Sequence, residues 1–406
     1  YTVDISGFNL VIPKDTQKVL TVKGTIVANP VAAVTANNYD LTLLKGSVVY
    51  SDTAGVTYTA ASGSDVTANN FIIFASQAAG KTISLASDNP LAGNVVVSSS
   101  GTTKVDVLKF NVKITDVNTT FSSGQIAEVT VDGTKVPKTM INSLELWDGS
   151  SLVTSAAPSW SGNTTGTVDW INFTLPVSAG TTKTFTVKAV LTQVASNYVN
   201  NGDGFLQITG GPKLTGIDAN SNVVTVDGST SVTGNKLYPF LVAPTFAYVT
   251  HSVLIKDTSD SSLDNIGDTS ITFSVTANGG SVFIPAVSNG TTTFGVDEKV
   301  LPTYNATNRA YTTSTTWSCN YPAVLRPDTG AGELWEVPSG VTANCIMSVL
   351  VNNYHATAAS TTAGYFSVAL EHVKWHDTAT STAGSYINQA WGFTNIKTPD
   401  FYLRGQ

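Results

Sequence analysis

The chain has 406 residues, which is long enough for two to four domains, and carries a formal net charge of −7 at pH 7. Charged residues make up only 12% of it, and the acidic balance provides no basic surface for the phosphates of a nucleic acid. No run of 18 apolar residues occurs, so the sequence predicts no membrane-spanning helix. Thr, Asn, Ser and Val are abundant, and no stretch holds the helical spacing of apolar residues over three turns. We therefore expect an all-β protein with essentially no helix.

A pair of strand-like runs joined by a proline-containing turn organises the chain. In Trp170–Leu191 the side chains of Phe185, Val187, Ala189 and Leu191 alternate with polar ones. A period of two with β-branched enrichment is typical of a strand with one buried face.

This pair of runs, which we call the organiser, recurs at Phe8–Ile26 and, more weakly, at Glu336–Leu350. Its prolines, Pro13, Pro176 and Pro338, are spaced by 163 and 162 residues. A long period of this kind indicates tandem copies of one module.

The copies divide the chain at residues 76 and 242. Residues 1–76 match only the second half of the module, and the roughly ninety residues that precede the organiser elsewhere have no counterpart here. Half a sandwich would expose a broad apolar face, which is costly in water. We expect the missing half to lie upstream in a longer gene product, with a second chain as the alternative source.

Residues 77–242 form a complete copy, with clean alternation in Val105–Ile114 and an Asp-Gly hairpin signal at 148–149. Residues 243–406 form a further copy with insertions, the longest of them at Leu301–Pro327. Short strands separated by turn residues at roughly ten-residue intervals predict β-sandwiches.

The segments VDVLKFNV (105–112), SLELWDGSSLV (143–153), AGTTKTFTVKA (179–189) and DTSITFSVTANGG (268–280) resemble Ig-like modules of large cell-surface proteins from candidate-phyla bacteria. They are also similar to modules of S-layer and surface-filament subunits. The resemblance implies tandem Ig-like β-sandwich domains and a structural role at the extracellular surface of a cell. It transfers no functional residues.

Cys319 and Cys345 are the only cysteines and lie within one copy. They predict either a disulfide between two strands or two buried free thiols. Closing the loop between them would contribute on the order of 3–4 kcal/mol if the bond were unstrained. Neither cysteine has the spaced partners of a zinc site.

Carboxylates gathered in one loop suggest calcium as the only cofactor, with a plain acidic loop as the alternative. Their spacing departs from the EF-hand pattern. The residues are Asp257, Asp260, Asp264 and Asp268.

The stretch 371–377 is the densest polar cluster, and on a strand His372, Lys374 and His376 would share a face. A metal site there would need a third ligand that the sequence does not supply, and a solvated strand end is the alternative.

Several asparagines head N-x-Ser/Thr triplets and are candidate glycosylation sites, although a chain rich in Asn and Thr produces some by chance. They are Asn118, Asn163, Asn172, Asn289 and Asn305.

No phosphate loop, nucleophile elbow or pair of converging carboxylates is found, so we expect no enzymatic activity. Glu333 and Glu336 are the only close glutamate pair. The favoured function is that of a structural subunit that associates with itself into a sheet or filament. The alternative is an adhesin or carbohydrate-binding tip, which would need Trp317, Trp335 and Trp391 on an open face to contact glycans.

Overall fold

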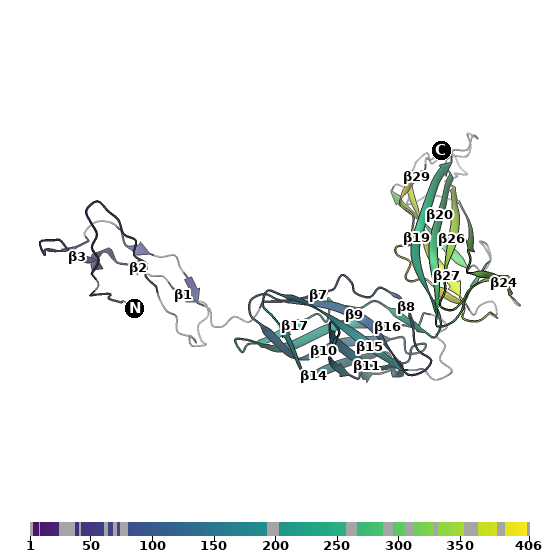
Figure 1. The fold of residues 1–406 in the computed structure, drawn as a ribbon, viewed down its shortest axis with the longest axis horizontal. Coiled ribbons are helices and arrows are strands. Elements are labelled where there is room, and N and C mark those ends of the chain that lie inside the picture. The colour runs from purple at the N-terminus through teal and green to yellow at the C-terminus, as the bar shows by residue number, and fades with distance from the viewer. Residues whose placement is uncertain are drawn as a thin grey trace. The chain divides into compact units, whose positions relative to one another are not determined.

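The protein is described by a computed structural model in which the chain divides into two compact units, Tyr1–Gln77 and Ala78–Gln406 (Figure 1). The described residues contain twenty-nine strands and two short 3-10 turns, so the all-β prediction is confirmed. Among these residues, no helix has the length and apolarity needed to cross a membrane. The described residues are 3–7, 9–23, 37–39, 42–60, 64–67, 71–73, 80–192, 203–256, 266–286, 295–304, 312–328, 332–352, 364–379 and 386–403.

The first sandwich of the second unit consists of two sheets. The seven-stranded sheet has the order β13 (Ser159–Ser161), β14 (Thr165–Val177), β10 (Thr119–Val131), β16 (Leu206–Asp218), β18 (Leu237–Phe240) and β8 (Gly93–Val96), with β17 (Val223–Asp227) also paired to β16. The five-stranded sheet has the order β12 (Ser151–Ala156), β11 (Ile141–Asp148), β15 (Thr182–Thr192), β9 (Thr102–Ile114) and β7 (Lys81–Leu85).

The core of this sandwich is built by the alternation seen in the sequence. Phe185 of β15 lies opposite Phe110 of β9, their ring centroids are 5.6 Å apart, and both are fully buried. Burying one such side chain contributes about 1.5–3 kcal/mol. Trp170 is also fully buried, and its indole N–H donates to the carbonyl of Leu144 at 3.0 Å, which offsets the cost of burying a polar group.

The second sandwich repeats the strand order of the first around the organiser. One sheet has the order β19 (Ala243–Lys256), β20 (Ile266–Asn278), β26 (Thr342–Asn352) and β23 (Thr312–Cys319). A second has the order β22 (Val296–Tyr304), β27 (Gly364–Trp375) and β28 (Ile387–Gln389), with β29 (Phe401–Leu403) also paired to β27. A third has the order β21 (Val282–Pro285), β25 (Gly332–Val337) and β24 (Val324–Asp328).

The turn that leads into the organiser strand is the same in both sandwiches. Gly180 and Gly340 have φ angles of 74° and 72°, in the left-handed region that glycine adopts without strain. The N–H of Gly180 donates to the carbonyl of Ile114, and that of Gly340 donates to the carbonyl of Ala277. Each turn thereby joins the organiser strand to its neighbour in the sheet.

The two sandwiches meet at a polar and aromatic junction. Trp391 stacks on Tyr238 with ring centroids 3.8 Å apart, and its indole N–H donates to Asn94 Oδ1 at 2.8 Å. The Asn94 amide donates to Gln389 Oε1 at 2.8 Å and to the carbonyl of Pro244 at 2.9 Å. Asn94 lies on β8 of the first sandwich, whereas its three partners lie in or beside the second sandwich.

The described residues of the first unit form short antiparallel ladders. The pairs are β1 (Asn37–Tyr39) with β6 (Phe71–Ile73), β2 (Thr42–Leu43) with β5 (Val66–Thr67), and β3 (Val49–Ser51) with β4 (Thr57–Thr59). Residues 9–23 form no strand, although the sequence predicts one at each end of this segment. None of the side chains described in this unit is buried.

Candidate functional site

The predicted calcium loop is largely outside the described residues, which include neither Asp257 nor Asp260 nor Asp264. Asp268 lies within β20, opposite Leu254 and Leu350. Its carboxylate forms an ion pair with Lys256. Asp268 is therefore already engaged by a cation from the neighbouring strand.

The candidate glycosylation sites are placed in different settings. Asn118 is exposed, and its Oδ1 accepts the N–H of Ala179 at 2.8 Å. Asn163 is exposed in a turn, and Asn172 is exposed on β14 with φ 59°, a left-handed conformation that asparagine tolerates. Asn289 and Asn305 lie outside the described residues.

Cys319 and Cys345 lie directly opposite each other in the β23–β26 ladder and are joined by a disulfide. Both are buried in the core of the second sandwich, and Cys345 occupies the position on β26 that Phe185 occupies on β15. The bond therefore ties the organiser strand to its neighbour through the core.

The tryptophans of the last copy do not form an open platform. Trp317 is 6% exposed, and Trp335 is half-buried against the core of the second sandwich. Trp391 is held in the junction between the sandwiches. In the first sandwich, the ammonium groups of Lys104 and Lys188 lie 5.2 and 4.9 Å from the ring centroid of the half-buried Trp147.

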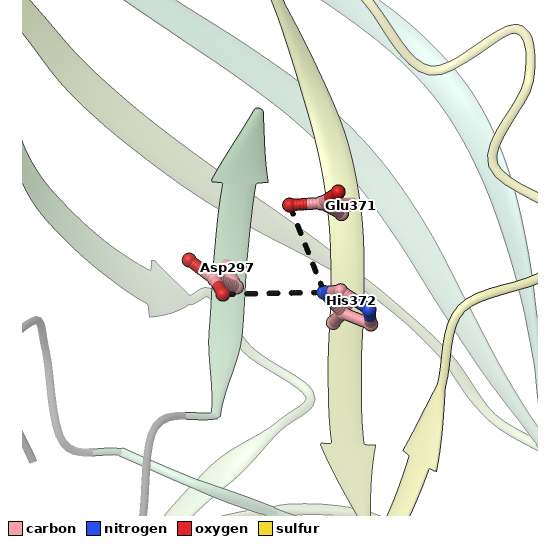
Figure 2. Close-up of side chains that lie close together, drawn as sticks. All are labelled: Asp297, Glu371 and His372. Atoms are coloured by element: carbon pink, nitrogen blue, oxygen red, sulfur yellow. Dashed lines mark ion pairs between the residues drawn. The ribbon is translucent and has the colours of Figure 1, made fainter. Parts of the chain in front are cut away.

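The densest chemical cluster among the described residues joins β22 and β27. Figure 2 shows Asp297 on one strand facing Glu371 and His372 on the other. Neighbouring residues on a regular strand point to opposite faces, but the register shifts here, with Asp297 opposite His372 and Glu298 opposite Leu370. Glu371 is thus the extra residue of a β-bulge, which turns its carboxylate to the same face as the imidazole.

Electrostatic contacts within the cluster are at ion-pair distance. His372 Nδ1 lies 3.9 Å from Asp297 Oδ2 and 3.9 Å from Glu371 Oε2. Partial burial, reinforced by the neighbouring Glu298 carboxylate, raises the pKa of Asp297 above its usual value, and the His372 imidazole opposes that rise. Lys299 Nζ lies 3.1 Å from Glu371 Oε1.

One ligand atom from each of Asp297, Glu371 and His372 could meet around a metal ion, since the three atoms lie within 4.8 Å of one another. Asp297 and His372 line a small depression of about 150 Å³ together with Lys374 and Asn388. The Lys299 ammonium already pairs with the Glu371 carboxylate, and a further lysine, Lys374, lines the depression. The arrangement therefore suits a charge-balanced ion-pair network better than a metal site.

The sequence points to two of the three residues of this cluster, because Glu371 and His372 both lie in the polar stretch 371–377. It places His372, Lys374 and His376 on one face, and in the structure all three are half-buried on alternating positions of one strand or directly after it. The third potential ligand, Asp297, comes from β22, and the bulge that turns Glu371 leaves no mark in the residue pattern. His376 itself accepts the N–H of Thr378 at 3.0 Å and lies 3.2 Å from Asp377.

Comparison with known proteins adds little. No family model matches the chain, and no curated protein matches it. A search of solved structures finds the crystal structure of the CupB6 tip adhesin from Pseudomonas aeruginosa, with 8% sequence identity and a TM-score of 0.17, covering 77% of this chain and 97% of that chain. A similarity this weak carries no argument about function.

Proposed function

We propose that the chain is a structural subunit of an extracellular cell-surface assembly, an S-layer or a surface filament, in which tandem β-sandwiches act as stiff spacers and associate with further copies. The observation that carries this proposal is the junction between the two sandwiches. A role in transmitting or resisting force requires modules that do not pivot freely. Neighbouring domains of one chain move relative to each other by default, unless the interface between them is tight enough to prevent it.

Hydrogen bonds and a pair of stacked aromatic rings hold the two sandwiches together at the junction. Gln389 is 3% exposed, and its Oε1 accepts both the Asn94 amide and the Trp375 indole N–H, at 2.8 and 3.0 Å. Separating the sandwiches would break the bonds of Asn94 to Gln389, Pro244 and Trp391, each worth a net of about 0.5–1.5 kcal/mol. Opening would also expose the stacked Tyr238 and Trp391 rings.

Two further features support an extracellular role. The Cys319–Cys345 bond fits an oxidising compartment, because structural disulfides are rare in the cytosol. Surfaces rich in Thr and Asn also make contacts that depend little on ionic strength, because few charges are available to screen. Self-association of such modules would be insensitive to changes in the medium outside a cell.

The adhesin alternative is less well supported, because Trp317 and Trp391 are occupied by the core and the junction. A catalytic role is also outside the proposal. Glu333 and Glu336 are three residues apart on β25, so their side chains leave opposite faces of the strand. Glu336 is moreover paired with Arg326 at 2.7 Å.

Electron microscopy of the native material tests the assembly itself. A regular sheet or filament is the expected result. Dispersed particles, or isolated spikes that bind glycan arrays, would overturn the structural proposal in favour of adhesion.

Stiffness can be tested on the 406-residue chain with spin labels at Leu152→Cys and Leu325→Cys, which lie exposed on the two sandwiches. The protein has no free cysteine among its described residues to interfere. We expect a narrow distance distribution that broadens in Trp391→Ala. The matched control Trp147→Ala, on the first sandwich alone, should leave it narrow, and a broad distribution in the parent chain would contradict the proposed stiffness.

A further inference from the structure

The first unit reproduces the local structure of β16, β17 and the turn between them. The ladder pair Val49–Thr59 has the same place in the repeat as Thr215–Thr225, 166 residues later, and the two adjoining pairs of each ladder correspond in the same way. The pattern shows that residues 48–60 carry the hairpin of the second half of a module.

The turns of the two hairpins match down to their hydrogen bonds. Asp52 Oδ1 accepts the N–H groups of Ala54 and Val56 at 2.9 and 3.0 Å. Asp218 Oδ1 accepts those of Asn220 and Asn222, both at 2.9 Å. Local sequence therefore specifies this turn in both units.

The environment of the equivalent side chains is opposite. Val48, Tyr58 and Val66 are 38%, 41% and 66% exposed in the first unit. Leu20 and Val22, also in the first unit, are 62% and 61% exposed. The residues at the same five places in the first sandwich are all fully buried. These fully buried residues are Leu214, Val224, Val232, Phe185 and Val187.

The sheet order of the sandwich shows what buries them. There β10 lies between β14 and β16, and β15 lies between β9 and β11. Residues 1–77 contain the counterparts of β14 to β18 but none of β9, β10 or β11. In the first unit, strands form where the partner lies within the unit, as in β3 with β4. The runs 9–13 and 19–23 form none, since their partners would be the counterparts of β10, β9 and β11.

We propose that residues 1–77 are the second half of a third sandwich and complete its core only against a first half of the same repeat. The partner is a segment with strands like β9, β10 and β11, in the order that the complete copy has. A second copy is a poor donor, because its own Phe110, Phe121 and Leu144 are fully buried and would have to leave that core. This inference does not depend on the structural role proposed above.

Two positions define how the partner differs from β10. A Cβ on Gly216 would lie 2.0 Å from the carbonyl oxygen of Thr120, and one on Gly210 would lie 2.6 Å from the backbone nitrogen of Glu128. A strand that pairs with β10 as β16 does therefore needs glycine at both places. The first unit has Tyr50 and Leu44 there. These contacts are with the backbone of β10, so the backbone of the natural partner strand must lie farther from Tyr50 and Leu44 than β10 lies from Gly216 and Gly210.

The test uses the full chain with a copy of residues 78–163 fused ahead of Tyr1. In one fusion the added copy and the first unit are unchanged, and in a second the first unit carries Leu44→Gly and Tyr50→Gly to match the glycines of β16. Amide exchange of residues 19–23 and 48–51 should slow at least about 100-fold in one fusion or both, relative to the unfused chain. A cysteine pair, Leu20→Cys with Phe110→Cys in the added copy, should then form a disulfide, since Phe185 faces Phe110 in the sandwich.

A control fusion with Val112→Asp and Val129→Asp in the added copy should show no slowing, because both residues are fully buried in the sandwich. Unchanged exchange in both test fusions would overturn the proposal. Protection of residues 19–23 in the unfused chain would overturn it as well. If that protection grew with protein concentration, the partner would be a second copy, and if it did not, the first unit would fold alone.

Discussion

The hairpins Val49–Thr59 and Thr215–Thr225 have the same register and the same Asp-centred turn, but only the second is part of a core. In the first unit, the Asp52 pKa is lowered, chiefly by the hydrogen bond from the Val56 N–H and also by the Tyr58 hydroxyl. The turn is thus formed without tertiary support. The comparison teaches that a β-hairpin of this repeat is specified locally, whereas burial of its apolar face requires strands from elsewhere in the module.

The largest predicted contrast is between equivalent core positions. Phe185→Ala removes a fully buried ring and should lower the free energy of unfolding of the first sandwich by about 3–5 kcal/mol. Leu20→Ala, at the equivalent place in the first unit, should change it by less than about 0.5 kcal/mol because Leu20 packs in no core. Urea unfolding followed by tryptophan fluorescence measures both, and equal losses would contradict the comparison.

Loss of the disulfide should lower the stability of the second sandwich but not that of the first. Replacing Cys319 and Cys345 together by serine should destabilise the second sandwich by about 2–4 kcal/mol. The first sandwich contains no cysteine and should keep its unfolding midpoint if the two unfold separately. Hydrogen exchange of β26 and β15 before and after the substitution reports on each sandwich, and equal changes in both would show that they unfold as one unit.

The turn aspartates provide a smaller and more local contrast. Asp218 is 4% exposed and holds two backbone N–H groups, so Asp218→Ala should destabilise the first sandwich by about 1–3 kcal/mol. Asp52→Ala should instead fray the β3–β4 hairpin and leave both sandwiches unchanged. Amide exchange at Asn222 and Val56 distinguishes the two effects, and loss of sandwich stability in Asp52→Ala would contradict the separation of the units.

The smallest effect concerns pH at the β22–β27 cluster. Because the pKa of Asp297 is raised in the folded state, folding favours the protonated carboxyl, and its contribution to stability falls as pH rises from the unfolded-state pKa, about 3.9, through the raised folded value. The side chain is 46% exposed, so the effect should stay below about 1 kcal/mol. Asp297→Asn should flatten this part of the stability–pH profile, which begins at the unfolded-state pKa of about 3.9. An unchanged profile would contradict the assignment.

The secondary-structure class follows from the sequence because the β signal is local. The alternation in Val105–Ile114 and in Phe185–Leu191 predicts strands that the structure contains in β9 and β15. The candidate cluster is different, because Asp297 reaches His372 only through the pairing of β22 with β27. Pairing between distant strands leaves no periodic signature in either one.

The sequence by itself determined the all-β class, the recurrence of the organiser and the turns at Asp52 and Asp218, since each depends on residues close together in the chain. Tertiary structure decided which apolar faces are buried, that Glu371 and His372 share a face, and that Trp391 lies in the junction between the sandwiches. The physical reason is that a strand has no stable edge or face of its own. Its hydrogen-bonding groups and its apolar side chains are satisfied only by partners that the rest of the fold brings to it.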